Sequence, residues 1–137
     1  MSAGSVLDTG VLLYAVSSRP SETAKRDRAR ALMRTPGWGT SAQVTQEFFV
    51  NATRGGAPPL TCEQALAAVN LLLMRPFVAT DAALLRAAMT LRERYQISYW
   101  DAAVVCAAIK LGSTVLYSED LNHGEIYEGV RVENPFI

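Results

Sequence analysis

The sequence has little of what marks disulfide-rich or histidine-dependent proteins. It contains two cysteines, Cys62 and Cys106, and one histidine, His123. Two cysteines are too few for a disulfide framework, and both fall in segments of helical pattern, where we expect buried free thiols in a reducing compartment. One histidine supports neither a histidine-built metal site nor a Ser-His-Asp arrangement, and we expect His123 to lie in a loop.

Long hydrophobic runs and an excess of one charge are missing too. No stretch approaches the ~18 uninterrupted apolar residues of a membrane-spanning helix. No basic segment precedes the first apolar stretch, which Asp8 interrupts, so we expect no signal peptide and a cytoplasmic protein. The 13 basic residues balance the 13 acidic residues, so the charge of the whole chain points to no particular partner.

The apolar content is high enough for a folded core. Half of the 137 residues are apolar, which excludes a disordered chain and predicts a single domain over residues 1–137. The charges are unevenly placed, because residues 19–34 hold six basic and two acidic side chains. Such a cluster is most often a solvated helix face. In a nuclease, it would instead be a surface that binds the phosphates of the substrate.

Short apolar segments alternate with segments of helical pattern along the whole chain. The expected strands are Ser5–Leu7, Trp38–Thr40, Phe77–Ala79, Thr114–Tyr117 and Val130–Val132. The expected helices are 11–16, 20–33, 41–53, 61–74, 81–95 and 101–109, and residues 121–129 are expected to be irregular. This alternation predicts a three-layer α/β fold, with a short, mostly parallel central sheet of about five strands covered by helices.

The segment from Ile97 to Leu121 places two carboxylates at one edge of that sheet. Ser98 lies three residues before Asp101, which opens an apolar run that ends at a glycine, so a helix begins here. The strand that follows leads directly to Asp120, and ligands collect at the carboxyl ends of parallel strands. Because the helix runs back from that same edge, Asp101 and Asp120 are expected to meet.

Four carboxylates, those of Asp8, Glu47, Asp101 and Asp120, lie where such a fold can bring them together. Three of them have ordinary alternatives. Asp8 can cap the helix that follows the first strand. Asp101 can be the acidic half of a capping box with Ser98. Asp120 can be an ordinary turn residue after a strand.

Glu47 is harder to explain as a solvated side chain. At ~100° per residue it shares one helix stripe with Val44, Phe48 and Asn51, which directs it toward the body of the protein. That stripe carries no lysine or arginine, although a buried carboxylate needs a partner. Two carboxylates ~5 Å apart repel by roughly 3 kcal/mol at an effective dielectric of ~20, so four need a cation. Oxygen ligands favour Mg²⁺ or Mn²⁺ over zinc, and metal with water on carboxylates is the pattern of phosphodiester hydrolysis.

Five segments of the sequence resemble PIN-domain proteins, specifically VapC-type toxins of type II toxin–antitoxin pairs. They are VLDTGVLLYA (6–15), SAQVTQEFFV (41–50), ISYWDAAVVCAA (97–108), LYSEDL (116–121) and ENPF (133–136). The resemblance implies a Rossmann-like PIN fold and an endoribonuclease that depends on Mg²⁺ or Mn²⁺. It also implies a homodimer that is inhibited by a cognate VapB-like antitoxin, whose C-terminal segment enters the active-site groove.

The same resemblance assigns roles to individual residues. It makes Asp8, Glu47, Asp101 and Asp120 the catalytic, metal-binding quartet. Thr9 and Ser118 match hydroxyl positions that accompany these acids.

Two neighbouring residues complicate that assignment. Gly10 departs from the family pattern, which commonly has Asn there, and this puts an accessory polar contact in question. Glu119 stands next to Asp120, and whether it shares the role of Asp120 is left open, although the spacing from Ser118 favours Asp120.

Two other functions compete with the nuclease. A phosphatase that resembles the haloacid dehalogenase superfamily also begins with a strand followed by an aspartate, and could use Lys110 and the Glu119-Asp120 pair. It needs a second acid two residues after the nucleophile, where this chain has Gly10. A PIN-like module that binds RNA or protein without cutting is the other, and the presence of all four acids disfavours it. We expect Tyr99 and Trp100, just before Asp101, to pack in the core rather than to serve as base-stacking platforms.

Overall fold

Six strands form one sheet in the order β3-β2-β1-β4-β6-β5 in the computed structural model, which describes all 137 residues. The strands are β1 (Ser5–Leu7), β2 (Trp38–Ser41), β3 (Phe77–Val78), β4 (Val115–Tyr117), β5 (Ile126–Tyr127) and β6 (Val130–Glu133). All neighbours pair in parallel except β5 and β6, which are antiparallel. The predicted mostly parallel sheet is confirmed, with six strands rather than about five.

The additional strand, β5, lies in the segment that was expected to be irregular, so that expectation is wrong there. Ile126 pairs with Arg131 and Tyr127 pairs with Val130 across a two-residue turn, Glu128-Gly129. Both turn residues have positive φ, 49° and 85°, as a type I′ hairpin requires. A two-residue strand is too short to show alternation, and glutamate in place of Asn or Asp hides the turn.

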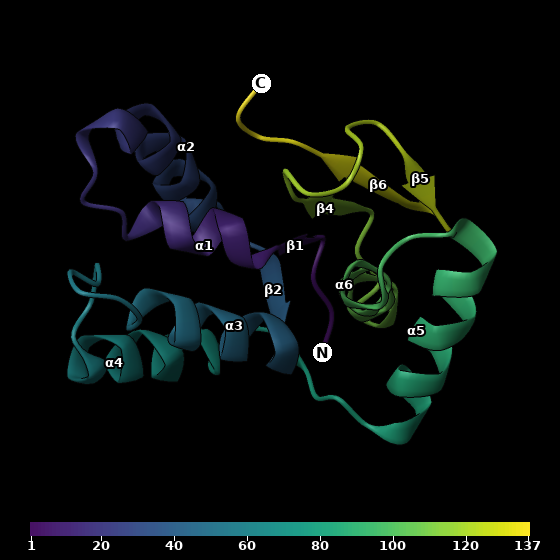
Figure 1. Ribbon diagram of the computed structural model, residues 1–137. Helices are drawn as coiled ribbons and strands as arrows, with labels where there is room; N and C mark the ends of the chain where they lie inside the picture. The colour runs from purple at the N-terminus through teal and green to yellow at the C-terminus, as the bar shows by residue number, and fades with distance from the viewer.

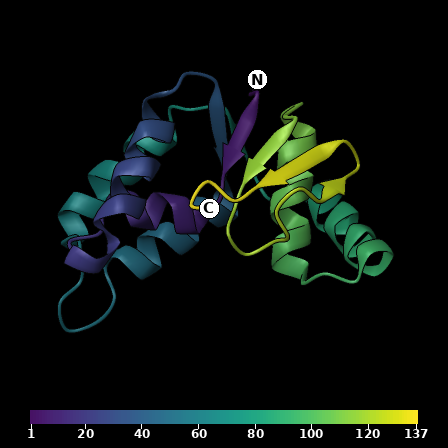
Figure 2. The same cartoon turned by 90° about the horizontal axis from the view of Figure 1, so that it is seen from above.

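Helices cover both faces of the sheet, as predicted. They are α1 (Thr9–Ala15), the 3₁₀ turn η1 (Pro20–Glu22), α2 (Thr23–Arg34), α3 (Ala42–Ala52), α4 (Cys62–Leu72), α5 (Ala82–Tyr95) and α6 (Tyr99–Lys110). Figures 1 and 2 show α1 to α4 on one side of the sheet and α5 with α6 on the other. None of these helices is long and apolar enough to cross a membrane.

Side-chain caps begin several of the helices where the sequence predicts them. The Ser41 hydroxyl accepts a hydrogen bond from the Val44 amide at the start of α3. Thr61 and Gln64 form both bonds of a capping box at the start of α4. These caps satisfy amides that have no partner within the helix, and so they fix where each helix begins.

The core is continuous through the middle of the sheet. Every residue from Ala102 to Ala108 in α6 is buried, so this helix is covered on all sides rather than amphipathic. Val6 of β1 and Leu116 of β4 are fully buried, because helices lie on both faces of the central strands. Cys106 lies in this core, whereas Cys62 is exposed in the first turn of α4, so the expectation of two buried thiols is wrong for Cys62.

The register of the central strands places the candidate site. Leu7 pairs with Tyr117, so Asp8 and Ser118, which follow them, leave neighbouring strands at the same edge. Strand β2 ends at Ser41 on the other side of β1, and α3 begins there with Glu47 in its second turn. The carboxyl edge of the sheet therefore brings together three segments that are far apart in the sequence.

Candidate active site

Asp8 is the most deeply placed of the four predicted acids. It is only 9% exposed and it is the N-cap of α1, with Oδ1 accepting the Thr9 amide at 2.8 Å. Its other oxygen, Oδ2, accepts the Ser118 hydroxyl at 2.8 Å, and Ser118 Oγ in turn accepts the Asp120 amide at 3.1 Å. Asp8 is thus both the predicted cap and one end of a hydrogen-bonded chain that leads to Asp120.

Glu47 reaches the same edge from α3. Its Oε1 accepts the Gln43 side-chain amide at 2.8 Å, and its Oε2 lies 3.4 Å from the Thr9 hydroxyl, which donates to it. The contact with Thr9, next to Asp8, confirms that Glu47 points toward the body of the protein. No lysine or arginine pairs with it.

Asp101 lies in the first turn of α6, and only half of its predicted capping box forms. The Ser98 hydroxyl accepts the Asp101 amide at 3.1 Å, but the return bond that completes the box at Thr61 and Gln64 is missing here. Capping therefore does not occupy the carboxylate of Asp101. The Gln43 side chain donates to the Trp100 carbonyl at 3.2 Å and so joins α3 to this end of α6.

The four carboxylates form one electrostatic group. Burial raises the pKa of Asp8 to about 6, although hydrogen bonds from Ser118 and Thr9 oppose this, and the charges of Asp120 and Glu47 raise it further. Desolvation also raises the pKa of Asp120, and the charges of Asp101, Glu119 and Glu47 add to that shift. None of the six ion pairs in the chain involves any of the four acids, so the group has no counter-ion from the protein.

The donor chemistry of this group suits a hard divalent cation. Carboxylate oxygens are the ligands that Mg²⁺ and Mn²⁺ prefer, and a cation would relieve the mutual repulsion that adds to the effect of burial on both pKa values. The side-chain positions do not form a closed coordination site, since no three acidic, histidine or cysteine side chains are placed to hold one ion. To ligate a single ion, the carboxylates would have to come closer together than they lie here.

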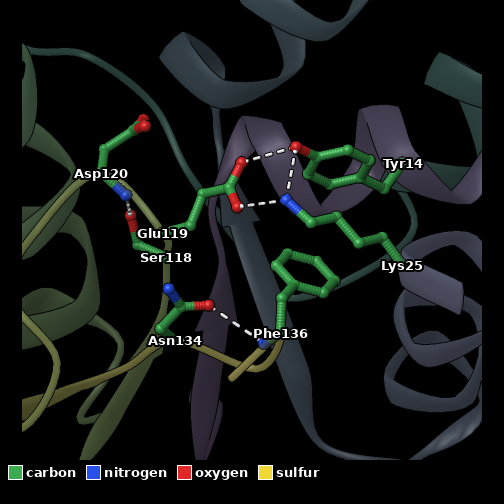
Figure 3. A network of polar contacts seen from close by, with 7 residues as sticks. All are labelled: Tyr14, Lys25, Ser118, Glu119, Asp120, Asn134 and Phe136. Atoms are coloured by element: carbon green, nitrogen blue, oxygen red, sulfur yellow. Dashed lines mark hydrogen bonds and ion pairs between the residues drawn. The ribbon is translucent and has the colours of Figure 1, made fainter. Parts of the chain in front are cut away.

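Glu119 differs from Asp120 in its surroundings. Its two carboxylate oxygens accept from the Tyr14 hydroxyl at 2.8 Å and from the Lys25 ammonium at 3.1 Å. Figure 3 shows the Glu119 carboxylate in contact with Tyr14 of α1 and Lys25 of α2, whereas the Asp120 carboxylate contacts none of the residues drawn. Glu119 therefore has a counter-ion, and Asp120 has none.

Lys25 belongs to the basic segment 19–34, and much of that segment is used structurally. Arg28 donates to the Pro135 carbonyl at 3.1 Å, and Arg30 donates to the Ala15 carbonyl at 2.8 Å. These bonds hold α2 against α1 and the C-terminal segment. The segment is therefore only in part a free basic face.

The expectation that Trp100 packs in the core is wrong, because 64% of its surface is exposed. Tyr99 is half-buried and does pack against the core, with its ring 5.1 Å from that of Trp100. The buried run of α6 begins at Ala102, so the first turn that carries Trp100 lies outside it. This boundary was readable in the sequence as the start of the apolar run.

A polar cavity of about 500 Å³ beside the acids was not expected at all. It is lined by residues of α1 and the loop that follows it, and by residues of the C-terminal end of α3 and the next loop, including Gly10, Asn51 and Arg54. Arg54 directly precedes Gly55-Gly56 in a loop, so no helix or strand periodicity predicts where its side chain points. Only the folded chain reveals that it lines this cavity together with Gly10 and Asn51.

The chain was compared with known proteins at the level of sequence and of structure. A structure of a toxin–antitoxin complex from Klebsiella pneumoniae matches with a TM-score of 0.71, 17% identity, and coverage of 96% of this chain and 98% of that chain. VapC20 of Mycobacterium tuberculosis, described as a sarcin–ricin loop cleaving toxin, matches with a TM-score of 0.65, 21% identity, and coverage of 93% and 98%. The structure of FitAB bound to an IR36 DNA fragment matches with a TM-score of 0.73, 17% identity, and coverage of 97% and 96%.

These similarities support the fold, and the sequence supports the family. A search of curated protein sequences gave no significant match. The family model of the PIN domain matches residues 5–129, which contain all four acids. On that match, the chain belongs to the PIN domain family.

Proposed function

We propose that this protein is a metal-dependent endoribonuclease that acts as the toxin of a VapBC-type toxin–antitoxin pair in the cytoplasm. The observation that carries the proposal is the group of four coupled carboxylates without a protein counter-ion at the carboxyl edge of the sheet. The structural similarity to VapC20, a sarcin–ricin loop cleaving toxin, supports RNA as the substrate.

Asp8, Glu47, Asp101 and Asp120 would hold Mg²⁺ or Mn²⁺. A bound ion of this kind lowers the pKa of water and stabilises the charge that develops on phosphate oxygens. Ser118 and the Thr9 amide hold the Asp8 carboxylate in place through two bonds of 2.8 Å. Gln43 and Thr9 hold Glu47, so the chain fixes two of the four carboxylates by hydrogen bonds before any ion binds.

The phosphatase alternative loses its support. Lys110 forms an ion pair with Asp81 at 3.3 Å, at the end of α6 opposite to Asp101. Nine residues of helix at ~1.5 Å per residue put it roughly 13 Å along the axis from Asp101. Lys110 therefore cannot act beside Asp8, and Gly10 remains where that chemistry needs a second acid.

The test measures metal binding and cleavage together. Calorimetric titration with Mn²⁺ should show binding to the native protein and much weaker binding to Asp8→Asn and Asp101→Asn. Both variants should lose Mn²⁺-dependent cleavage of RNA, while Asp81→Asn, which alters an acid remote from the site, should keep binding and cleavage. Retained cleavage in both site variants would show that the assignment is wrong, and metal binding without cleavage would favour the non-catalytic module.

We propose a VapB-like antitoxin as the inhibiting partner and a homodimer as the assembly. An apolar cavity of about 400 Å³ lies between α1, α3 and α4, and Leu71 and Met74 at its edge are 68% and 78% exposed. Exposed apolar side chains beside an apolar cavity are typical of protein-binding surfaces. Co-purification with a small partner protein, followed by sequencing of RNA ends after that partner is removed, tests the partner and the activity.

A further inference from the structure

Three polar side chains, those of Gln43, Glu47 and Asn51, form a stripe along one face of α3. The Gln43 amide donates to Glu47 Oε1 at 2.8 Å, and the Asn51 amide donates to the Glu47 carbonyl at 2.8 Å. At a rise of ~1.5 Å per residue, the eight steps from Gln43 to Asn51 span roughly 12 Å. Glu47 belongs to the acid group, so the stripe extends from that group in both directions.

Trp100 lies at the first end of the stripe. Its carbonyl accepts a hydrogen bond from Gln43 at 3.2 Å, and it directly precedes Asp101. Its 64% exposure contrasts with the 4% of Trp38, the only other tryptophan. An exposed indole beside a nuclease site is suited to stack on an unpaired base.

The polar cavity lies at the other end of the stripe. Asn51 lines it, and the Asn51 side-chain oxygen accepts a hydrogen bond from the Arg54 guanidinium, which lines it too. Its volume of about 500 Å³ lies within the range of roughly 300–1,000 Å³ that is usual for sites of small organic ligands. A nucleotide is a ligand of this size.

The charges around the cavity favour an anion. Arg19 and Arg54 line it, and neither takes part in any of the six ion pairs of the chain. Two carboxylates line it as well. Glu119 is balanced by Lys25, whereas Glu22 accepts the Ser17 hydroxyl at 2.6 Å and keeps its negative charge, so the two arginines leave a small excess of positive charge. Two guanidinium groups are therefore available to bind phosphate.

We propose that the α3 stripe is the floor of a track for single-stranded RNA. Trp100 stacks on a base on one side of the acid group, and the cavity holds a phosphate and its nucleotide near Arg19 and Arg54 on the other side. The inference rests on the proposed ribonuclease function and names the side chains that bind the strand on each side of the cleaved bond. A paired base is not free to stack on Trp100, so the track selects single strands over duplexes.

Binding is measured in the Asp8→Asn background, which prevents cleavage while Asn still accepts the Thr9 amide. The probe is a single-stranded RNA of about eight nucleotides, within the usual range of single-strand sites. RNA should quench the fluorescence of Trp100 and leave that of the buried Trp38. Trp100→Ala should raise the Kd by roughly 5- to 100-fold, the loss expected for one stacked base.

Arg54→Gln tests the cavity. It should raise the Kd and lower the slope of log K against log salt by about 0.7, the value for one phosphate contact on a single strand. Arg34→Gln is the matched control, because Arg34 is exposed at the end of α2, near the amino end of β2. That variant should change neither quantity, and circular dichroism confirms that all variants are folded.

The outcomes separate the two proposals. The track is overturned if Arg54→Gln behaves like Arg34→Gln, if RNA leaves Trp100 fluorescence unchanged, or if duplex RNA binds as tightly as the single strand. In each of these cases, Mn²⁺-dependent RNA cleavage by the native protein would leave the ribonuclease proposal standing. If the native protein neither binds nor cleaves RNA, the proposed function fails and the track fails with it.

Discussion

Lys25 of α2 forms an ion pair with Glu119, the residue directly before Asp120, at a distance of 3.1 Å. The Lys25 ammonium also donates to the Tyr14 hydroxyl at 3.1 Å and lies 5.5 Å from the centre of the Phe136 ring. Figure 3 shows this network, in which Lys25 lies between Tyr14, Glu119 and the ring of Phe136. Two adjacent carboxylates thus have opposite environments, because one is neutralised and the other is repelled by its neighbours.

This difference predicts that Glu119 and Asp120 are not interchangeable in metal binding. Asp120→Asn should lower the affinity for Mn²⁺ by roughly tenfold or more, the effect of losing about 1.4 kcal/mol of attraction. Glu119→Gln should change that affinity far less, because the charge it removes is already balanced by Lys25. Calorimetric titration of both variants decides this, and equal losses would make Glu119 a metal ligand.

The pH dependence of stability should report the buried carboxylate of Asp8. Burial raises its pKa from 3.8 to about 6, so the folded protein holds this proton more tightly than the unfolded chain does. The contribution of Asp8 to the free energy of unfolding is therefore highest below about pH 4 and is lost as the pH rises through about 6.

Asp8→Asn removes this dependence. Without divalent ions it should raise the free energy of unfolding at pH 7.5 by roughly 1–3 kcal/mol, and the gain should shrink toward pH 4. Denaturant unfolding at several pH values measures it. Added Mn²⁺ should stabilise the native protein more than the variant, and a gain independent of pH would contradict the assigned cause.

The sequence was sufficient for most of the fold because its signals are local and strong. Helix caps such as Ser41 and the capping box of Thr61 and Gln64 fixed helix starts, and apolar segments between helices fixed the parallel strands. The hairpin of β5 and β6 was missed because its turn uses Glu128 and its strand has only two residues. Such a strand is specified by pairing with β6, which no local pattern reveals.

The site was predictable in its acids and unpredictable in its surroundings. Strand ends and one helix stripe brought Asp8, Glu47 and Asp120 to one edge, as topology alone requires. The neutralisation of Glu119 by Lys25 joins residues 94 positions apart, and the sequence held no sign of it. The exposure of Trp100, by contrast, was within reach of the sequence, because the apolar run begins only at Ala102.

Thr40 provides a test of the core that is independent of the site. Its hydroxyl is fully buried in β2 and has no hydrogen-bond partner. Because a buried unpaired hydroxyl is costly, Thr40→Val should raise the free energy of unfolding by roughly 1 kcal/mol. Thr45 is the matched control, since its buried hydroxyl donates to the Ser41 carbonyl at 2.8 Å.

Thr45→Val should therefore not share the gain, because it removes a formed hydrogen bond and leaves the Ser41 carbonyl with one partner fewer. We expect it to lower the free energy of unfolding by roughly 0.5–1.5 kcal/mol. Urea midpoints of the two variants, compared with the native protein, measure both effects. Destabilisation by Thr40→Val would mean that its hydroxyl has a partner in solution.

Gly39 and Gly10 should respond to alanine in opposite directions. A Cβ at Gly39 would lie 2.8 Å from the Pro76 carbonyl oxygen and 2.9 Å from a methyl of Leu111. Both distances are shorter than the contacts that Cβ atoms make in folded proteins. That carbonyl accepts the Thr40 amide at 2.9 Å, so it cannot move away without weakening the link between β2 and the start of β3. Gly39→Ala should thus lower the free energy of unfolding by roughly 1–3 kcal/mol, as overpacking does.

A Cβ at Gly10, in the first turn of α1, would meet nothing within 4 Å. Gly10→Ala should accordingly raise the free energy of unfolding by up to about 1 kcal/mol, because alanine loses less backbone entropy in a helix. Thermal and urea unfolding of both variants give the two signs. Destabilisation by Gly10→Ala would mean that other atoms occupy the space beside Gly10. The cavity that Gly10 helps to line would then be smaller than the structure indicates.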